Sequence, residues 1–283
     1  MKLQNVWAIA QNETAIKELA AGAATLGENS TLVSLSGSEN IAAVIPAIIE
    51  AAKTNKPDMI LVEASRNGRL IAGLLAAAMG TAPLADTSAI SVDGDSVTTK
   101  RMVYGGAAFK TEKATGTAIV ICGNGLFEAG AAAANKLDIA AGAAGGIRFK
   151  EKKAKSGNSV NLGAAKKVVG VGRGLGQPEN LELAQRLAAA IGAEVGCSRP
   201  VAEESKWLAK ELYIGVSGVM MKPDIYIGVG ISGQVQHMVG INQALTIVAI
   251  NKDKNAPIFK QCDYGIVGDL EKVLPALAAK FGK

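Results

Sequence analysis

Two features of this 283-residue chain have the residue types that chemistry needs, a glycine-rich turn and a single histidine. Gly228 to Gly233 matches G-x-G-x-x-G after the β-type run IYIGVG, and His237 follows four residues later. Such a turn places backbone N–H groups and the start of a helix where a phosphate can bind. The stretch from Ile225 to Asn251 therefore predicts a strand, a turn, a short helix and a second strand around a nucleotide site.

Two arginines stand at the ends of other expected strands. Arg173 follows the apolar run from Val168 to Val171, where it can hold a phosphate bidentately or pair with a nearby acid. Arg199 precedes Pro200, and proline disfavours a helical conformation in the residue before it, so we expect Arg199 to be extended. Ligands of open α/β sheets bind at this carboxyl edge.

Two interpretations of the glycine pattern remain open from the residues alone. Asp253 lies about 20 residues beyond Gly233, where the ribose-binding acid of a nicotinamide-dependent dehydrogenase is expected, so Gly228, Gly230 and Gly233 could bind such a cofactor. The same glycines could form no more than a tight turn between a strand and a helix.

His237 lacks the partners of a catalytic triad or a metal site, because no nucleophile elbow and no second histidine accompany it. It could be a core histidine with one hydrogen bond. Together with Ser232, Gln236, Asn251 and Arg199 it forms a set of neutral donors and one cation, which suits a large, polar, redox-active cofactor better than hydrolysis.

The elements that position these residues predict an α/β fold of two domains, each a mostly parallel sheet flanked by helices. Scarce aromatics and abundant alanine and glycine are typical of this class. Strands and helices alternate through the first part of the chain, followed by a hairpin around Asp93-Gly94-Asp95 and a closing strand from Ala118 to Cys122. A glycine-rich and basic piece between Gly142 and Val160 reads as a linker, with a charge cluster from Arg148 to Lys155. We place the domains at 1–150 and 161–283.

Composition also excludes several classes of function. The formal charge of +5 is modest for this length, and no basic run is interleaved with aromatics, so we expect no nucleic-acid partner. No apolar run approaches a membrane span, and the first residues lack the features of a secretory signal. The three cysteines are far apart, which favours a reducing cytoplasm and encodes no metal site.

Several longer segments resemble the α subunit of electron-transfer flavoproteins, and in particular its FixB branch. They are GVGRGLG, GCSRPVAE, YIGVSG, VGISGQVQHMVG and VAINKDKNAPIFKQCDYGIVGD, with MVYGG in the first domain. The resemblance covers essentially the whole chain and is most specific from Val168 onward. It implies a Rossmann-like C-terminal domain that binds FAD, and a first domain that packs against a homologous β subunit.

The resemblance also implies roles for individual residues. Those on the phosphate and ribityl side of FAD would be Arg173, Ser198 and Ser232, and those toward the adenosine would be Asn251, Asp269 and Leu270. Arg199, Ser217, Gln236 and His237 would surround the isoalloxazine. The same contact set includes Ile214, Gly215, Val216, Gly233, Gln234 and Val235. Many family members have Gln-Thr-Gly where this chain has Val216-Ser217-Gly218; serine keeps a hydroxyl that can reach the flavin N5, whereas valine lacks the amide.

The resemblance implies an electron carrier, with no catalytic residues of its own, that moves electrons between acyl-CoA or other dehydrogenases and a quinone-linked or ferredoxin-linked acceptor. One alternative within the family is a bifurcating complex, in which the β subunit holds a second FAD instead of AMP. Alternatives from other classes are the nicotinamide-dependent dehydrogenase and a structural subunit whose pocket holds AMP or nothing.

Overall fold

The computed structural model describes residues 2–36, 40–130, 135–142, 150–151 and 161–282, and these fall into two compact units. One unit comprises Met1–Tyr104 with Ala108–Ala154, and the other comprises Gly105–Ala107 with Lys155–Lys283. The linker predicted between Gly142 and Val160, with its charge cluster, lies almost wholly outside the described residues. Each unit is an α/β structure built on a parallel sheet, which confirms the predicted fold class.

The first unit contains a six-stranded parallel sheet in the order β4-β8-β3-β1-β2-β9. Its strands are β1 (Leu3–Ile9), β2 (Gly27–Ser36), β3 (Met59–Glu63), β4 (Leu84–Thr87), β8 (Ala118–Cys122) and β9 (Asn135–Ala140). Its helices are α1 (Glu13–Leu26), α2 (Ile41–Asn55) and α3 (Arg66–Ala78). The Asn12 side chain caps α1 by accepting from the backbone N–H groups of Thr14 and Ala15.

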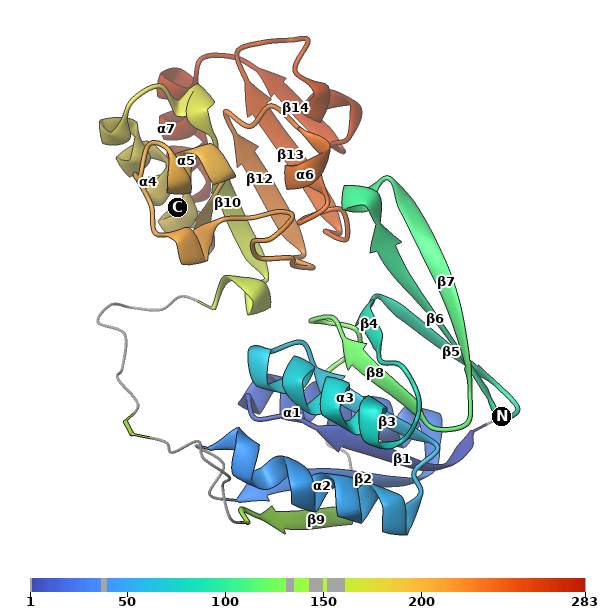
Figure 1. Ribbon diagram of the computed structural model, residues 1–283. Coiled ribbons are helices and arrows are strands. Elements are labelled where there is room, and N and C mark those ends of the chain that lie inside the picture. Colours follow the sequence, from blue (N-terminus) through green and yellow to red (C-terminus); the bar gives the residue numbers. More distant parts are fainter. Residues whose placement is uncertain (1, 37–39, 131–134, 143–149, 152–160, 283) are drawn as a thin grey trace. The chain divides into compact units, whose positions relative to one another are not determined.

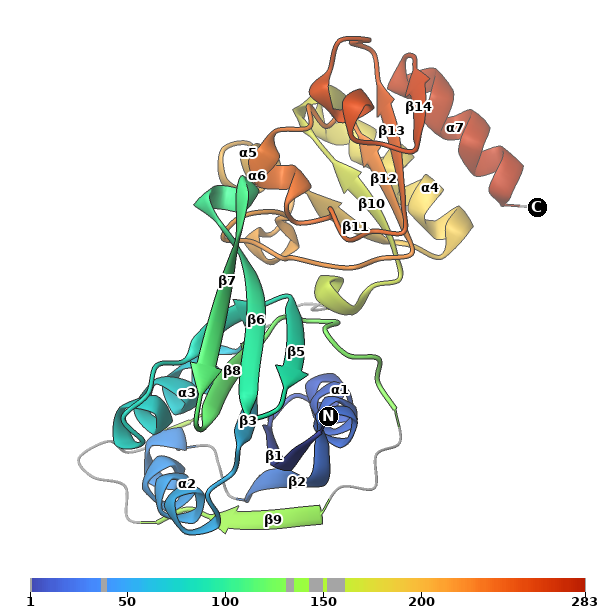
Figure 2. The ribbon, with the colours of Figure 1, turned by 90° about the vertical axis from the view of Figure 1, so that its right-hand side faces the viewer.

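Successive side chains of β1 point to opposite faces of the sheet, so the core of this unit has two layers. Trp7 and Ile9 pack with α2 and α3, whereas Val6 and Ala8 pack with α1 on the opposite face. Figure 2 shows α1 on one side of the sheet and α2 and α3 on the other. Burial on both faces explains why β3 reads as a continuous apolar run.

Two strands of the first unit, β7 and β9, are not predicted from the sequence. β9 follows β8, so Ala118–Cys122 does not close the domain as predicted. β9 lies at the edge of the sheet and is mostly exposed, so it lacks the apolar run by which the buried strands are recognised. The predicted hairpin is present as β5 (Ala89–Asp93) and β6 (Ser96–Val103), and β7 (Ala108–Thr115) adds a third, exposed strand to this antiparallel sheet.

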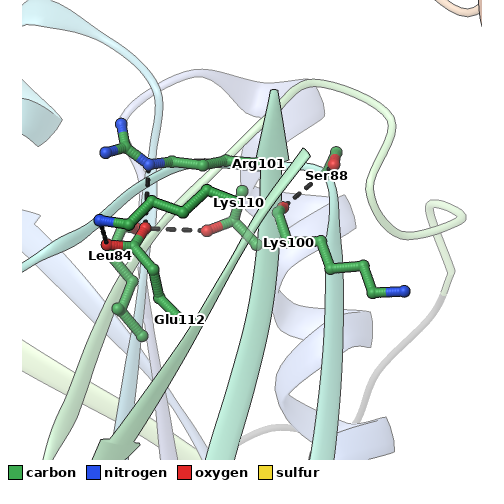
Figure 3. Close-up of polar contacts among 7 residues, drawn as sticks. Leu84, Ser88, Lys100, Arg101, Lys110 and Glu112 are labelled. Atoms are coloured by element: carbon green, nitrogen blue, oxygen red, sulfur yellow. Dashed lines mark hydrogen bonds and ion pairs between the residues drawn. The ribbon is translucent and has the colours of Figure 1, made fainter. Parts of the chain in front are cut away.

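A cluster of charges joins β6 to β7. Arg101 and Lys110 lie directly opposite each other in the strand register, and the Glu112 side chain, two residues along β7, pairs with both cations. Its carboxylate is 2.9 Å from Arg101 Nε and 2.8 Å from Lys110 Nζ (Figure 3). The hydrogen bond from Lys110, helped by the charge of Arg101, lowers the pKa of Glu112. The carboxylate therefore relieves repulsion between two cations that the register places face to face.

Replacing Glu112 with glutamine should lower the free energy of unfolding by about 1 kcal/mol at pH 7, because the two cations then repel each other. The pKa of this carboxyl is lower in the folded protein, so its contribution exists above the ordinary glutamate pKa and is lost as the pH falls through the folded value. Urea unfolding at pH 7 and below pH 4 measures this. The matched control is Glu128→Gln, an exposed glutamate without an ion pair among the described residues, and an equal loss there would contradict the interpretation.

The second unit contains a five-stranded parallel sheet in the order β11-β10-β12-β13-β14. Its strands are β10 (Lys167–Val171), β11 (Glu194–Cys197), β12 (Ile225–Val229), β13 (Thr246–Asn251) and β14 (Tyr264–Val267). Its helices are α4 (Leu181–Ile191), α5 (Arg199–Glu203), α6 (Val235–Met238) and α7 (Leu270–Phe281). The strand, turn, helix and strand predicted from Ile225 to Asn251 are confirmed (Figure 1).

The two faces of this sheet have different coverings. Val169 and Val171 pack with α4 and α7, while Val168 and Tyr226 pack on the opposite face with Met238 of α6. Figure 2 shows α4 and α7 together on one side of the strands and α6 on the other. In the described part of the chain, no helix has both the length and the apolar character needed to cross a bilayer.

Candidate functional site

The carboxyl edge of the second sheet gathers the residues for which the sequence predicts cofactor contacts. All five strands are parallel, so the segments that follow them lie along one edge. Ile214 reaches this edge because its N–H donates to the carbonyl of Cys197, the last residue of β11. The other segments are Arg173 after β10, Ser198 and Arg199 after β11, Ser232 to His237 after β12, Asn251 at the end of β13, and Asp269 with Leu270 after β14.

The topological switch point of this sheet lies between β10 and β12. The chain passes from β10 to β11 on one side and then to β12 on the other, so two glycine-rich turns diverge from adjacent strand ends. Gly172 N–H donates to Val229 at 2.9 Å, and Gly174 N–H donates to Gly230 at 3.0 Å. The two glycine-rich stretches therefore form one contact at the position where open α/β sheets bind their ligands.

The glycines of G-x-G-x-x-G are explained by packing within the chain. Gly230 and Gly233 have φ values of 64° and 87°, a region that side chains rarely adopt. A Cβ atom would overlap the Ile258 backbone at Gly233, and it would lie 2.7 Å from Gly174 at Gly230. Asp253, the acid of the dehydrogenase interpretation, accepts a hydrogen bond from the Asn255 N–H in a local turn. The pattern thus has a structural cause that does not require a nicotinamide nucleotide.

Arg199 is helical, so the prediction of an extended conformation is wrong. It is the first residue of α5, and Ser198 before it is the extended residue, with φ −77° and ψ 157°. Pro200 is tolerated because the first N–H groups of a helix have no intrahelical acceptor. The predicted place at the carboxyl end of β11 is nevertheless correct.

Both arginines of the edge are exposed and paired only with exposed or half-buried acids. Arg199 Nε lies 2.7 Å from Glu203 Oε2, and this hydrogen bond raises the pKa of Arg199. Arg173 lies 3.5 Å from Glu204, with both side chains 67% exposed. Exposed pairs of this kind contribute little to stability, so both guanidinium groups can exchange their partners for an anionic ligand.

Ser217 lies at the tip of a tight loop that packs on α6. The Val216 N–H donates to the Gln236 carbonyl at 2.8 Å, and a Cβ atom at Gly215 would overlap the same carbonyl. Ser217 itself is exposed and has φ 68°, a left-handed conformation unusual for serine. Non-glycine residues in this region cluster at functional sites, where the surrounding structure holds them. Gly215 and Val216 thus pack the loop against Gln236 and His237, and Ser217 is exposed at its tip.

Ser217→Gly should leave the free energy of unfolding unchanged or raise it by up to about 1 kcal/mol, because glycine adopts φ 68° without strain. Ser217→Ala keeps the strain and removes only the hydroxyl, so it should match the native protein in stability. Denaturant unfolding of the two variants measures the difference. A marked loss of stability in Ser217→Gly would show that the hydroxyl stabilises the loop itself.

His237 is the one buried polar side chain of this edge, with 7% exposure. Its Nε2 lies 2.7 Å from the hydroxyl of Tyr226, while Nδ1 has no hydrogen-bond partner among the described residues. Burial lowers the pKa of His237 to about 4, and the Ile214 backbone opposes this shift only in part. The imidazole is therefore neutral at pH 7, with Nε2 against the phenol and Nδ1 enclosed within the protein.

The remaining predicted residues divide into exposed and structural groups. Ser232, Gln234, Val235 and Gln236 are exposed. Asn251 donates to the Ile231 carbonyl at 2.9 Å and thus ties β13 to the turn after β12. Asp269 caps α7, and the Leu270 side chain lies in the hydrophobic core, which leaves only backbone groups of Leu270 for a ligand.

Three residues that complete the geometry were missed from the sequence. They are Tyr226 behind His237, and Glu203 and Glu204 beside the arginines. Tyr226 had a signal, since a phenol in an otherwise apolar strand needs a buried partner. Among the described residues, no group of three histidine, cysteine, aspartate or glutamate side chains is arranged to bind a metal ion.

The edge fits a large anionic cofactor with a polar ring. Two exposed guanidinium groups suit a diphosphate, and exposed hydroxyl and amide groups suit ribityl and ring atoms. His237 supplies a neutral, buried imidazole whose Nδ1 makes no direct hydrogen bond among the described residues. Nothing in this donor set conflicts with a flavin dinucleotide.

Comparisons with known proteins agree with this chemistry. Residues 161–242 match the family model described as the electron transfer flavoprotein FAD-binding domain, and residues 6–148 match the electron transfer flavoprotein domain. Protein FixB of Escherichia coli strain 55989 is 40% identical over 98% of both chains. Protein FixB of Escherichia coli O1:K1 is 46% identical over 231 residues, which cover 80% of this chain and 74% of that relative. Asn251, Asp269 and Leu270 lie beyond the matched FAD-binding range.

Proposed function

Because this chain belongs to the electron-transfer flavoprotein α-subunit family, an FAD-binding family of electron carriers, we propose that it passes electrons from dehydrogenases to a quinone-linked or ferredoxin-linked acceptor. Its partner is a β subunit, with which the family's α subunits form heterodimers. One observation carries the proposal: polar groups from all five strand ends of the second sheet meet at one edge, next to a neutral, buried histidine.

FAD supplies the isoalloxazine ring, which accepts and returns the electrons. We assign Arg173, Ser198 and Ser232 to its phosphates and ribityl chain. Arg173 contributes an exposed cation, and the Ser198 hydroxyl is free for this task because it makes no capping hydrogen bond with α5. Asn251, Asp269 and Leu270 are assigned to the adenosine. For Leu270 this contact involves the backbone, because its side chain is buried.

Four side chains are assigned to the isoalloxazine: Arg199, Ser217, Gln236 and His237. A reduced flavin gains negative charge, which the Arg199 guanidinium stabilises. The Ser217 hydroxyl is presented by a strained loop and can donate to a ring nitrogen. Contacts from Ile214, Gly215, Val216, Gly233, Gln234 and Val235 complete the set. Since Ile214 is fully buried, its part is to support the loop.

The two parts of the chain then have separate tasks. We propose that residues 1–150 pack against the β subunit and that residues 161–283 hold FAD. The separate cores of the two units support this division, because each sheet buries its own apolar faces.

Co-purification with the β subunit tests the proposal. We expect a yellow complex with a flavin spectrum, and the flavin released by denaturation should be FAD. One FAD per heterodimer supports simple electron transfer, whereas two FAD molecules per heterodimer support a bifurcating complex. A colourless complex that takes up no FAD on reconstitution would contradict the proposal, and NADH binding without flavin would support a dehydrogenase.

A further inference from the structure

A buried pair of side chains links β12 to α6 behind the proposed flavin site. The Tyr226 hydroxyl lies 2.7 Å from His237 Nε2, and the two rings are tilted by 53° with centroids 6.0 Å apart. Tyr226 is fully buried and His237 is 7% exposed. Gly170 of β10 makes room for the phenol, since a Cβ atom there would overlap the Tyr226 hydroxyl. The pair is therefore enclosed by the sheet and fixed in geometry.

The protonation states of both rings are set by burial. Burial raises the pKa of the Tyr226 phenol well above its usual range, so the phenol keeps its proton. Burial lowers the pKa of His237 to about 4, so the imidazole is neutral at pH 7 and has a single N–H. The remaining question is which ring nitrogen of His237 carries that proton.

The surroundings favour one tautomer. If Nε2–H donated to the phenol, the phenol proton and the Nδ1 lone pair would both lack partners among the described residues. If the phenol donates to Nε2, only the Nδ1–H lacks a direct hydrogen bond. The Ile214 backbone, which stabilises the protonated form of the ring, offers this N–H an acceptor that an Nδ1 lone pair could not use. Buried polar groups are rarely left without partners, so the second arrangement is favoured.

We propose that Tyr226 is a positioning residue: its hydroxyl donates to Nε2 of His237 and fixes the imidazole as the Nδ1–H tautomer, which turns the ring proton toward the Ile214 backbone, at the base of the loop assigned to the isoalloxazine. This inference rests on the proposed function. The loop of Ser217 packs on α6 at Gln236, so His237 lies directly beneath the segment assigned to the isoalloxazine. A ring proton held on the side of this loop favours negative charge on the reduced flavin.

Nitrogen NMR of the heterodimer with ¹⁵N-labelled histidine tests the tautomer. The His237 signal is the one that disappears in His237→Gln, since this chain has no other histidine. We expect a protonated Nδ1 and an unprotonated Nε2 in the native complex. Tyr226→Phe removes the donor while keeping the ring, and should move most of the proton population to Nε2 and lower the flavin reduction potential.

Tyr213→Phe is the matched control, because it removes a buried phenol hydrogen bond to the Val216 carbonyl without touching His237. Its tautomer pattern should equal that of the native complex. A native signal with the proton on Nε2, or an unchanged pattern in Tyr226→Phe, would overturn the inference. Failure of the proposed function appears separately as absence of FAD, and the tautomer is still measurable in the flavin-free complex.

Discussion

Replacing Arg199 with alanine should lower the flavin reduction potential by about 60 mV or more, which for one electron is a tenfold change in the equilibrium constant. The guanidinium is 64% exposed at the carboxyl end of β11 and is paired with Glu203 at 2.7 Å. Its removal leaves Glu203 without its cation at the edge assigned to the ring, so a negative charge on the reduced flavin would lose a cation and gain an unbalanced anion. Spectroelectrochemical titration of the purified heterodimer measures the shift.

Arg186→Ala provides a closely matched control. Arg186 is 68% exposed and pairs with Glu182 at 2.6 Å with the same four-residue spacing, but it lies on α4 instead of at the strand ends. Both variants lose one exposed helical ion pair, so their stabilities should differ little. An equal potential in Arg199→Ala and Arg186→Ala would show that Arg199 acts only as a surface charge.

The parallel sheets could be predicted because burial on two faces leaves a strong signal. β3, β8 and β12 are short, almost wholly apolar runs. In the helices between the strands, apolar residues recur with helical spacing. β7 and β9 could not be predicted in this way, since neither is buried on two faces and their polar side chains resemble those of loops. Pairing with a neighbouring strand, which sequence periodicity does not record, makes them strands.

The site was predictable to the level of strand ends but not of contacts. Parallel strands bring their carboxyl ends together, so residues that follow separate strands meet at one edge whatever their distance along the chain. Partners of side chains depend on the path of the loops: Glu203 reaches Arg199 because α5 starts one residue earlier than Pro200 suggested. The contact between Tyr226 and His237 crosses from the face of β12 to α6, and only the packing of α6 on that face creates it.

Gly172→Ala should destabilise the second unit by about 2–3 kcal/mol and abolish retention of FAD, because it overpacks the switch point. Gly172 has an ordinary φ of −115°, so the backbone accepts alanine without strain. The added Cβ would overlap the Gly230 carbonyl oxygen and lie 3.0 Å from the Ile231 Cα. These are backbone atoms, which cannot move aside as a flexible side chain can. The turn after β10 and the turn after β12 must therefore separate, and the groups assigned to FAD on both turns separate with them.

Gly176→Ala, four residues further on, tests whether this effect comes from the contact or from the glycine itself. Gly176 has φ 87° and ψ −57°, so alanine is strained by about 1–3 kcal/mol, but no atom lies within 4 Å of its Cβ position. Denaturant unfolding and FAD content of both variants give the comparison. We expect Gly176→Ala to lose some stability and keep FAD, and Gly172→Ala to lose both. If Gly172→Ala kept its FAD, the two glycine-rich stretches would not act as one unit, and the role of the G-x-G-x-x-G turn would be limited to packing against Ile258.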